Sequence, residues 1–327
     1  MFLAVPMKEE QVQDVLYLQM HLSIDMDLIS SFFISNEQLL QNFKDKLFNS
    51  YVICTTNSLY QRPLGCIVFC EDYSFENGHG FYVDTFYVVS GLRNQKLGHL
   101  LLSRLCEEIR DINYNYIKIY FINTKKLGKL YNRIGFCNET LYDKRINLLE
   151  VYGPNQVEHF LTIKSHPTEC TLNTEVVISP IISTIGKSNV RMINVFQSHS
   201  NKFAGFTEQI SYCGWLGPML LFKDFVGSTH IIDINLFKYR LRERQSDGPQ
   251  PLGIWFEIPE SNEVLIKNLE LFDVRNITKL EGWEIGFLYR YGTNDFQYFF
   301  HAFPPEGSVR CGTLDRFDVL YRNIYFC

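Results

Sequence analysis

Residues 81–102 read FYVDTFYVVSGLRNQKLGHLLL, and this stretch decides the fold of the first half of the chain. β-Branched and aromatic residues fill 81–89, which is typical of a strand. A polar loop follows at 93–98, and apolar residues then recur at helical spacing from Leu97 to Ile112. A loop between a strand and a helix turns backbone N–H groups and the positive end of the helix dipole toward one spot. The stretch therefore predicts a site for an anion such as a pyrophosphate.

The sequence on either side of this stretch predicts the other elements of the first half. Before it we expect a strand, two amphipathic helices and two more strands, at 2–7, 12–21, 39–47, 51–55 and 66–71. After it we expect an alternating strand, a short helix and two strands, at 116–122, 127–133, 134–137 and 145–151. This order predicts an α/β (α+β) domain, in which helices flank a mixed, mostly antiparallel sheet.

Two segments resemble the hallmarks of the GNAT N-acetyltransferases. The loop resembles their motif A, Arg/Gln-x-x-Gly-x-Gly/Ala at the start of a helix, and Leu130-Tyr131 followed by Gly135-Phe136 resembles their second hallmark. The run 81–98 is most similar to the spermidine/spermine and thialysine acetyltransferases, which place an acidic residue where Asp84 stands. The resemblance covers residues 1–152. It implies an acyl-CoA N-acyltransferase fold that uses acetyl-CoA and an amine substrate, without a metal.

The same resemblance implies which residues hold acetyl-CoA. They lie at the end of the strand, in the loop, in the first turn of the helix and after the next strand: Phe86, Tyr87, Val88, Val89, Arg93, Asn94, Gln95, Lys96, Leu97, Gly98, His99, Asn123 and Thr124. The backbone of Val88 and Val89 would offer N–H groups to the thioester oxygen, or it is an ordinary sheet edge. His99 would contact a phosphate, or it is simply a residue of the helix's first turn.

Two side chains are candidates for catalysis by this resemblance. Tyr131 stands where the family's general acid protonates the leaving thiolate, although a core aromatic on an amphipathic helix would give the same pattern. Asp84 would bind an amine cation or act through water as a base. A strand carboxylate that faces solvent is the alternative for Asp84.

The loop departs from the family pattern at two positions. Glycine is usual at the second and fourth places from the arginine, where this chain has Asn94 and Lys96, and only Gly98 remains. Glycine permits positive φ and close approach to phosphate, and asparagine tolerates the left-handed region. Lys96 would either reach a phosphate as a point charge or fill the groove. Further along, Thr124 and Leu127 replace the family's usual Asn and Ala.

The second half contains echoes of the first. Pro251-Leu-Gly253 echoes Pro63-Leu-Gly65, Arg275–Gly282 echoes the loop, and Leu320–Cys327 echoes Leu130–Cys137, at offsets between 182 and 190 residues. We therefore predict a GNAT domain at 1–152, a linker at 153–160 and a degenerate GNAT-like copy at 161–327. In this copy we expect strands at 254–258, 264–271 and 297–303 and a helix at 283–291. The alternative is chance similarity between two halves rich in Tyr and Phe.

The composition argues against some classes of function. The net charge of −5 gives no general attraction for nucleic acid or anionic membranes, and nine cysteines show no zinc-binding spacing. The sequence shows no signal peptide or membrane span, so we expect a cytoplasmic protein, with the nucleus as an alternative site, and allow for a homodimer. Two hypotheses follow. One is an acetyl-CoA-dependent N-acetyltransferase that acts by direct attack of the amine, and the other is a non-catalytic GNAT-like binding or regulatory protein.

Overall fold

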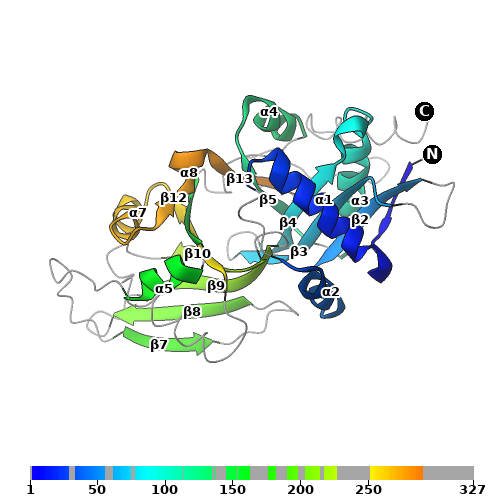
Figure 1. Ribbon diagram of the computed structural model, residues 1–327. Helices are drawn as coiled ribbons and strands as arrows, with labels where there is room; N and C mark the ends of the chain where they lie inside the picture. The colour runs from blue at the N-terminus through cyan, green and yellow to red at the C-terminus, as the bar shows by residue number, and fades with distance from the viewer. Residues whose placement is uncertain are drawn as a thin grey trace, which may run out of the picture.

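The computed structural model describes residues 2–28, 34–55, 62–74, 78–112, 114–134, 136, 145–152, 154–162, 176–181, 190–197, 203–213, 217–226 and 251–289. Within them the chain forms two mixed sheets, of six and seven strands, with helices around them (Figure 1).

The first sheet is built mainly from the first half of the chain. Its order is β1-β2-β3-β4-β5-β13, with bounds Phe2–Pro6, Asn49–Thr55, Gly65–Ser74, Gly78–Val88, Tyr116–Ile122 and Trp283–Tyr289. Only β4 and β5 pair in parallel; the other neighbours are antiparallel. This confirms the mixed, mostly antiparallel sheet expected from the sequence.

Helices cover both faces of the first sheet. On one face lie α1 (Val12–Asp25) and α2 (Asn36–Lys44), and on the other lie α3 (Leu97–Ile112) and α4 (Lys125–Ile134). Short 3-10 turns, η1 (Glu9–Gln11) and η3 (Ser90–Leu92), precede α1 and the loop. Alternate residues of β5 point to opposite sides of the sheet: Tyr116 and Tyr120 lie in the core on the α1 side, whereas Ile117 and Phe121 lie in the core with α3 and α4.

The second sheet has the order β12-β6-β11-β10-β9-β8-β7. These strands span Arg275–Asn276, Ile146–Tyr152, Gly253–Pro259, Gly217–Val226, Phe203–Cys213, Val190–Gln197 and Val176–Ile181. Helices α5 (Pro154–Thr162) and α7 (Glu263–Glu270) pack on it around a core of their own, and α8 (Ile277–Glu281) lies beside β6.

The two halves exchange one strand each. β6 belongs to the first half by sequence but lies in the second sheet, antiparallel to β11, while β13 closes the first sheet antiparallel to β5. Both pairs are in register along all seven residues, with Tyr152 opposite Gly253 and Ile122 opposite Trp283. The predicted division at 152 therefore does not follow the sheets, and the predicted linker at 153–160 lies mostly in α5.

The strand exchange reveals the register of the duplication. In each sheet four antiparallel strands (β1–β4 and β7–β10) are followed by a parallel fifth strand and then by the exchanged strand. Residue 116 lies 137 positions before residue 253, and residue 146 lies 137 positions before residue 283, so β5 corresponds to β11 and β6 to β13. The helices that follow β5 and β11, α4 and α7, begin 138 positions apart.

This register corrects the echoes noted in the sequence. Pro63-Leu-Gly65 opens β3, but Pro251-Leu-Gly253 opens β11, whose counterpart is β5. Arg275–Gly282 forms β12 and the short helix α8 rather than a loop before a long helix. Leu320–Cys327 and the predicted strand at 297–303 lie outside the described residues. Of the predicted strand at 134–137, residues 135 and 137 lie outside them as well, and Ile134 is the last residue of α4.

Two elements of the second half were assigned to the wrong class. Residues 264–271, predicted as a strand, form α7, because the Asn262 side chain accepts a hydrogen bond from the Leu265 N–H (3.3 Å) and Leu265, Ile266 and Leu269 are buried at helical spacing. Residues 283–291, predicted as a helix, contain β13. There Trp283, Ile285 and Phe287 alternate toward one core, which is a strand's period of two.

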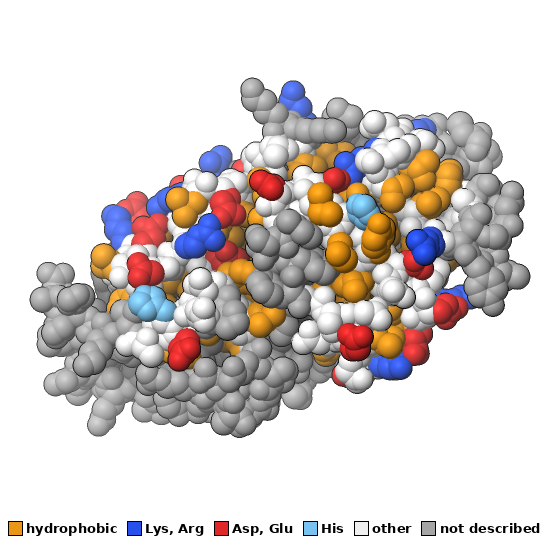
Figure 2. All heavy atoms as spheres, in the orientation of Figure 1, with side chains coloured by type: hydrophobic (Ala, Val, Ile, Leu, Met, Phe, Trp, Pro, Cys, Tyr) orange, Lys and Arg blue, Asp and Glu red, His pale blue; other side chains and the backbone are white. Residues whose placement is uncertain are grey.

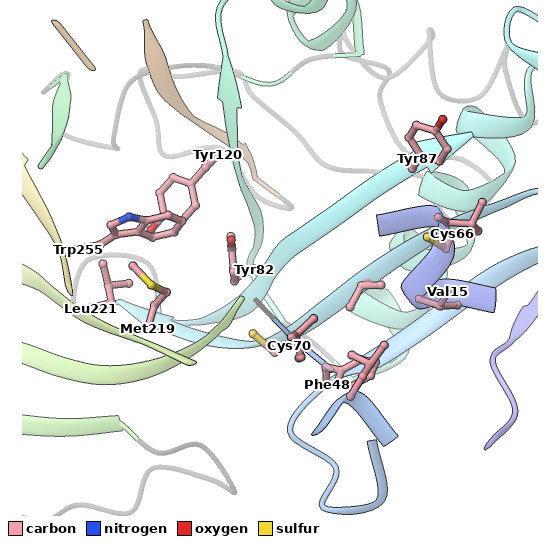
Figure 3. Packing of buried hydrophobic residues seen from close by; sticks show 14 of the residues in the cluster. Val15, Phe48, Cys66, Cys70, Tyr82, Tyr87, Tyr120, Met219, Leu221 and Trp255 are labelled. Atoms are coloured by element: carbon pink, nitrogen blue, oxygen red, sulfur yellow. The ribbon is translucent and has the colours of Figure 1, made fainter. Parts of the chain in front are cut away.

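The two sheets share a hydrophobic core. Figure 3 shows Tyr82 and Tyr120 of the first sheet beside Met219, Leu221 and Trp255 of the second. The rings of Tyr120 and Trp255 meet edge-on, with centroids 4.9 Å apart. The second half therefore covers the part of the first sheet's face that α1 and α2 leave open.

Candidate active site

The loop before α3 has a left-handed backbone at two positions. Asn94 and Lys96 both adopt positive φ, 68° and 62°, so the two positions where the family has glycine keep the left-handed conformation. The Lys96 carbonyl accepts a hydrogen bond from the Leu100 N–H (3.1 Å), which starts α3 at the end of the loop. The N–H groups of a helix's first turn have no partner within the helix, and they point out of its end. The side chain of Lys96 is exposed.

Beside the loop, strands β4 and β5 separate. Among the described residues their parallel pairing runs from Gly80 and Tyr116 to Val83 and Ile119 and stops there. β4 nevertheless continues to Val88, and β5 to Ile122. The two strand ends therefore diverge next to the N-terminus of α3.

The two predicted donors to a thioester oxygen have different backbone partners. The Val89 N–H donates to the Leu64 carbonyl (3.1 Å), so it is already used. The Val88 carbonyl accepts a hydrogen bond from Arg93 Nε (3.0 Å). Val88 therefore remains the predicted donor of the two.

The neighbouring side chains divide between the two faces. Phe86 packs against Gly98 on the α3 side, where an added Cβ at Gly98 would lie 3.2 Å from Phe86 Cζ, and Leu97 is buried in the same core. Tyr87 lies on the α1 side, beneath the guanidinium of Arg93 (5.2 Å to the ring centroid). Burial, helped by Asp25, raises the pKa of Tyr87. Gln95 is exposed and His99 is half-buried in the first turn of α3.

Arg93 ties the loop to α1. Its guanidinium pairs with Asp25 at the end of α1, and its Nε donates to the Val88 carbonyl (3.0 Å). This arrangement uses Arg93 to hold the loop's shape. No local sequence pattern indicates the contact with Asp25, because the two residues are 68 positions apart.

Asn123 and Thr124 have structural partners. The Thr124 hydroxyl accepts the Leu127 N–H (3.2 Å) and so caps α4. The Asn123 side chain donates to Glu284 Oε1 (2.7 Å), and its N–H donates to the Gly282 carbonyl (2.7 Å). These two predicted cofactor contacts thus join β5 to α4 and to the exchanged strand β13.

Asp84 is the extra residue of a β-bulge. Val68 pairs with Thr85 and Phe69 pairs with Val83, so the register between β3 and β4 skips Asp84. Asp84 Oδ2 accepts hydrogen bonds from the Thr85 hydroxyl (2.8 Å) and from Gln19 Nε2 (3.4 Å). Asp84 is half-buried and lies on the α1 side of the sheet, and its other carboxylate oxygen, Oδ1, is buried. The sequence analysis did not single out Gln19. Its spacing of four from Val15 places it on the buried side of α1, and a glutamine at such a position could have indicated a polar contact.

Tyr131 lies on α4, in the core on the α3 side of the sheet. Its ring is 6% exposed and packs against Phe121 of β5 and Phe136, with centroids 4.5 Å and 5.5 Å away. Burial raises the pKa of Tyr131, which keeps the phenol protonated at neutral pH. The ring therefore has a packing role, and the hydroxyl is in the protonation state that a general acid needs. Its echo, Tyr321, lies outside the described residues.

Other kinds of site are not indicated in the described part of the chain. No group of three or more His, Cys, Asp or Glu side chains there could hold a metal ion. No helix there is long and apolar enough to cross a membrane. In Figure 2 apolar side chains gather over α1, whereas charges of both signs cover α7 and α8.

Sequence comparison agrees with this geometry. Residues 21–136 match the model of a family described as the acetyltransferase (GNAT) family. The first half thus contains a GNAT-family acetyltransferase domain, and its mixed sheet flanked by helices is the GNAT fold. No curated protein matches the sequence of the chain.

Several solved structures follow a similar chain path. A tandem GNAT protein from the clavulanic acid biosynthesis pathway aligns over 90% of this chain and 100% of its own, at 10% identity and a TM-score of 0.48. The NatC complex bound to Gag peptide and CoA aligns over 43% of this chain and 92% of its own, at 20% identity and a TM-score of 0.34. A GNAT-family acetyltransferase from Staphylococcus aureus Mu50 aligns over 42% and 84%, at 15% identity and a TM-score of 0.35.

Proposed function

We propose that the protein is an acetyl-CoA-dependent N-acetyltransferase whose active centre lies in the first sheet, beside the N-terminus of α3. The observation that carries this proposal is the left-handed backbone of Asn94 and Lys96 beside the divergent ends of β4 and β5. A non-glycine residue in this conformation costs about 1–2 kcal/mol. Two such residues in one loop support a role that requires this particular shape.

Each requirement of direct acetyl transfer has a candidate among the described residues. The amides of the loop and of the first turn of α3 would hold the diphosphate, and the Val88 N–H would stabilise the developing oxyanion. The amine nitrogen attacks the thioester carbonyl, so that a C–N bond forms and the C–S bond breaks. The proton from nitrogen leaves toward Asp84, directly or through water, and the thiolate takes a proton from Tyr131.

The proposed acceptor is a small, polyamine-like amine. Support comes from Asp84, which offers a partly buried carboxylate on the side of β4 opposite α3. A cationic amine would form a charge-assisted hydrogen bond there. A protein amine is the other acceptor to include in an activity assay.

Calorimetry with acetyl-CoA tests the proposal, using two glycines of the same segment. Gly98→Val would place a Cβ 3.2 Å from Phe86, at the start of α3, whereas a Cβ at Gly91 meets nothing within 4 Å. We expect the unaltered chain to bind acetyl-CoA with a Kd below about 1 mM. Gly98→Val should abolish this binding and Gly91→Val should preserve it. No heat at millimolar acetyl-CoA would instead favour the non-catalytic binding protein.

An assay with a panel of amines then tests the acceptor. Asp84→Asn keeps the shape of the side chain but removes its charge, so kcat/KM for a polyamine should fall by about 10- to 100-fold. Acetyl-CoA binding should stay as it is. Equal activity of Asp84→Asn toward polyamines would rule out the proposed acceptor class.

A further inference from the structure

Behind Asp84 lies a short chain of hydrogen bonds that ends in α1. Gln19 Nε2 donates to the Thr85 hydroxyl oxygen (3.0 Å), and the Thr85 hydroxyl donates to Asp84 Oδ2 (2.8 Å). Gln19 Nε2 also lies 3.4 Å from the same carboxylate oxygen. Gln19 and Thr85 are both 0% exposed, whereas Asp84 as a residue is half-buried. The buried pair therefore supports the carboxylate of a less deeply buried residue.

The β-bulge makes this arrangement possible. Consecutive residues of a regular strand point to opposite faces, so Asp84 and Thr85 would normally be separated by the sheet. Because Asp84 is the extra residue of the bulge, both side chains reach Gln19 on the α1 side. Bulges commonly redirect a side chain next to an active site in this way.

Gln19 is a poor choice for stability alone. Its Oε1 is buried and has no hydrogen-bond partner. Turning the amide over would not help, because Oε1 would then face the carboxylate of Asp84. A buried polar atom without a hydrogen-bond partner destabilises the folded state, and an apolar side chain of similar size would avoid this cost. The fold gains little from a glutamine at this position.

We propose that Gln19 and Thr85 are positioning residues that fix the carboxylate of Asp84 for the acceptor amine. Two donated hydrogen bonds hold Oδ2 against rotation of the carboxylate, so the amine meets it in one orientation. This role rests on the proposed N-acetyltransferase function. It extends that function by making acetylation of the amine depend on two residues, Gln19 and Thr85, that do not touch the substrate.

Matched variants of the full chain test this role through steady-state kinetics. Thr85→Val removes the hydroxyl at nearly constant shape, Thr85→Ser restores it, and Gln19→Met removes the amide. Thr85→Val and Gln19→Met should lower kcat/KM for the amine by about 10-fold, the effect of one hydrogen bond to a charged group. Thr85→Ser should recover most of it. The KM for acetyl-CoA should not change in any of them.

A control and a stability measurement separate positioning from a merely structural role. Ser23→Ala alters another buried residue of α1, whose hydroxyl donates to the Met20 carbonyl (2.7 Å), and should leave the amine kinetics unchanged. Gln19→Met should keep or raise the Tm, because it removes the unsatisfied oxygen. Unchanged amine kinetics in Thr85→Val and Gln19→Met would overturn the positioning role alone. An unaltered chain that acetylates no amine would refute the proposed function and this role with it.

Discussion

At the scale of single residues, Lys96 shows how a departure from a motif can leave its geometry intact. The side chain is exposed and the backbone takes the glycine conformation at φ 62°. Lys96→Gly should therefore raise the free energy of unfolding by about 0.5–1 kcal/mol, since relief of left-handed strain exceeds the added freedom of the unfolded chain. Urea unfolding measures this change.

Lys46 provides the matched control for Lys96. It also adopts positive φ (58°) and is exposed, but it lies in the turn after α2. Lys46→Gly should give a similar stabilisation and leave acetyl-CoA affinity unchanged. A loss of stability in Lys96→Gly alone would mean that the lysine side chain stabilises the loop.

Tyr131 carries the second prediction at this scale. Tyr131→Phe keeps the ring contacts with Phe121 and Phe136, so the Tm should hardly change, while kcat should fall by about 100-fold or more if the hydroxyl protonates the thiolate. Because burial raises the pKa of Tyr131, the acid form persists in alkaline solution. The kcat of the unaltered chain should thus show no falling limb up to about pH 10, the ordinary pKa of tyrosine. Unchanged kcat in Tyr131→Phe would leave Tyr131 a packing role only.

At the scale of elements, the sequence predicted the first half well. The bounds of α3 and β5 agree with the expected 97–112 and 116–122, because each has a long, regular apolar period. In the second half, α7 and β13 are only eight and seven residues long. The apolar residues of so short a segment fit both the helical period of 3.6 and the strand period of two. The bulge at Asp84 and the contact between Gln19 and Thr85 depend on pairing with distant segments, which no local pattern reveals.

The exchanged strand β13 offers a test of the topology. A Cβ at Gly286 would lie 3.1 Å from Phe121, 3.2 Å from Phe136 and 3.4 Å from Ile119. Gly286→Val should therefore cost about 1–3 kcal/mol through overpacking and loosen the pairing of β13 with β5. Hydrogen exchange should speed up at 116–122 and stay unchanged in β8 and β9. Faster exchange confined to the second sheet would contradict the strand order.

At the scale of the whole molecule, a buried cluster of charges joins the two sheets. Asp72 and Lys118 of the first sheet meet Lys223 and Glu257 of the second: Lys118 Nζ lies 3.1 Å from Asp72 and 2.9 Å from Glu257, and Lys223 Nζ lies 2.7 Å from Asp72. The hydroxyl of Tyr116 donates to Asp72 (2.7 Å), and that of Tyr120 donates to Glu257. These four charges balance, and each is at most 5% exposed.

Breaking the balance of this cluster should be more damaging than removing an opposite pair. Lys118→Met leaves an uncompensated carboxylate and should cost about 3–5 kcal/mol, whereas Lys118→Met combined with Glu257→Gln should cost less than the two single changes together. Burial alone would lower the pKa of Lys118, but Asp72 and Glu257 outweigh it and raise the pKa. The lysine's contribution is therefore complete below its ordinary pKa of about 10.4 and is lost only as pH rises further. Urea unfolding at pH 7 and pH 11 of the single and double variants checks both statements.

The exchange of β6 and β13 makes each half depend on the other for folding. A fragment of residues 1–152 would leave seven residues of β5 without β13 and all of β6 without β11. Exposed strand edges of this length invite aggregation, so the fragment should be insoluble or poorly folded alone, and co-expression with 153–327 should recover a soluble complex. The full chain should unfold in one calorimetric transition, because the shared core and the exchanged strands couple the sheets. A soluble, monomeric 1–152 fragment with a sharp transition of its own would show instead that the sequence boundary marks an independent folding unit.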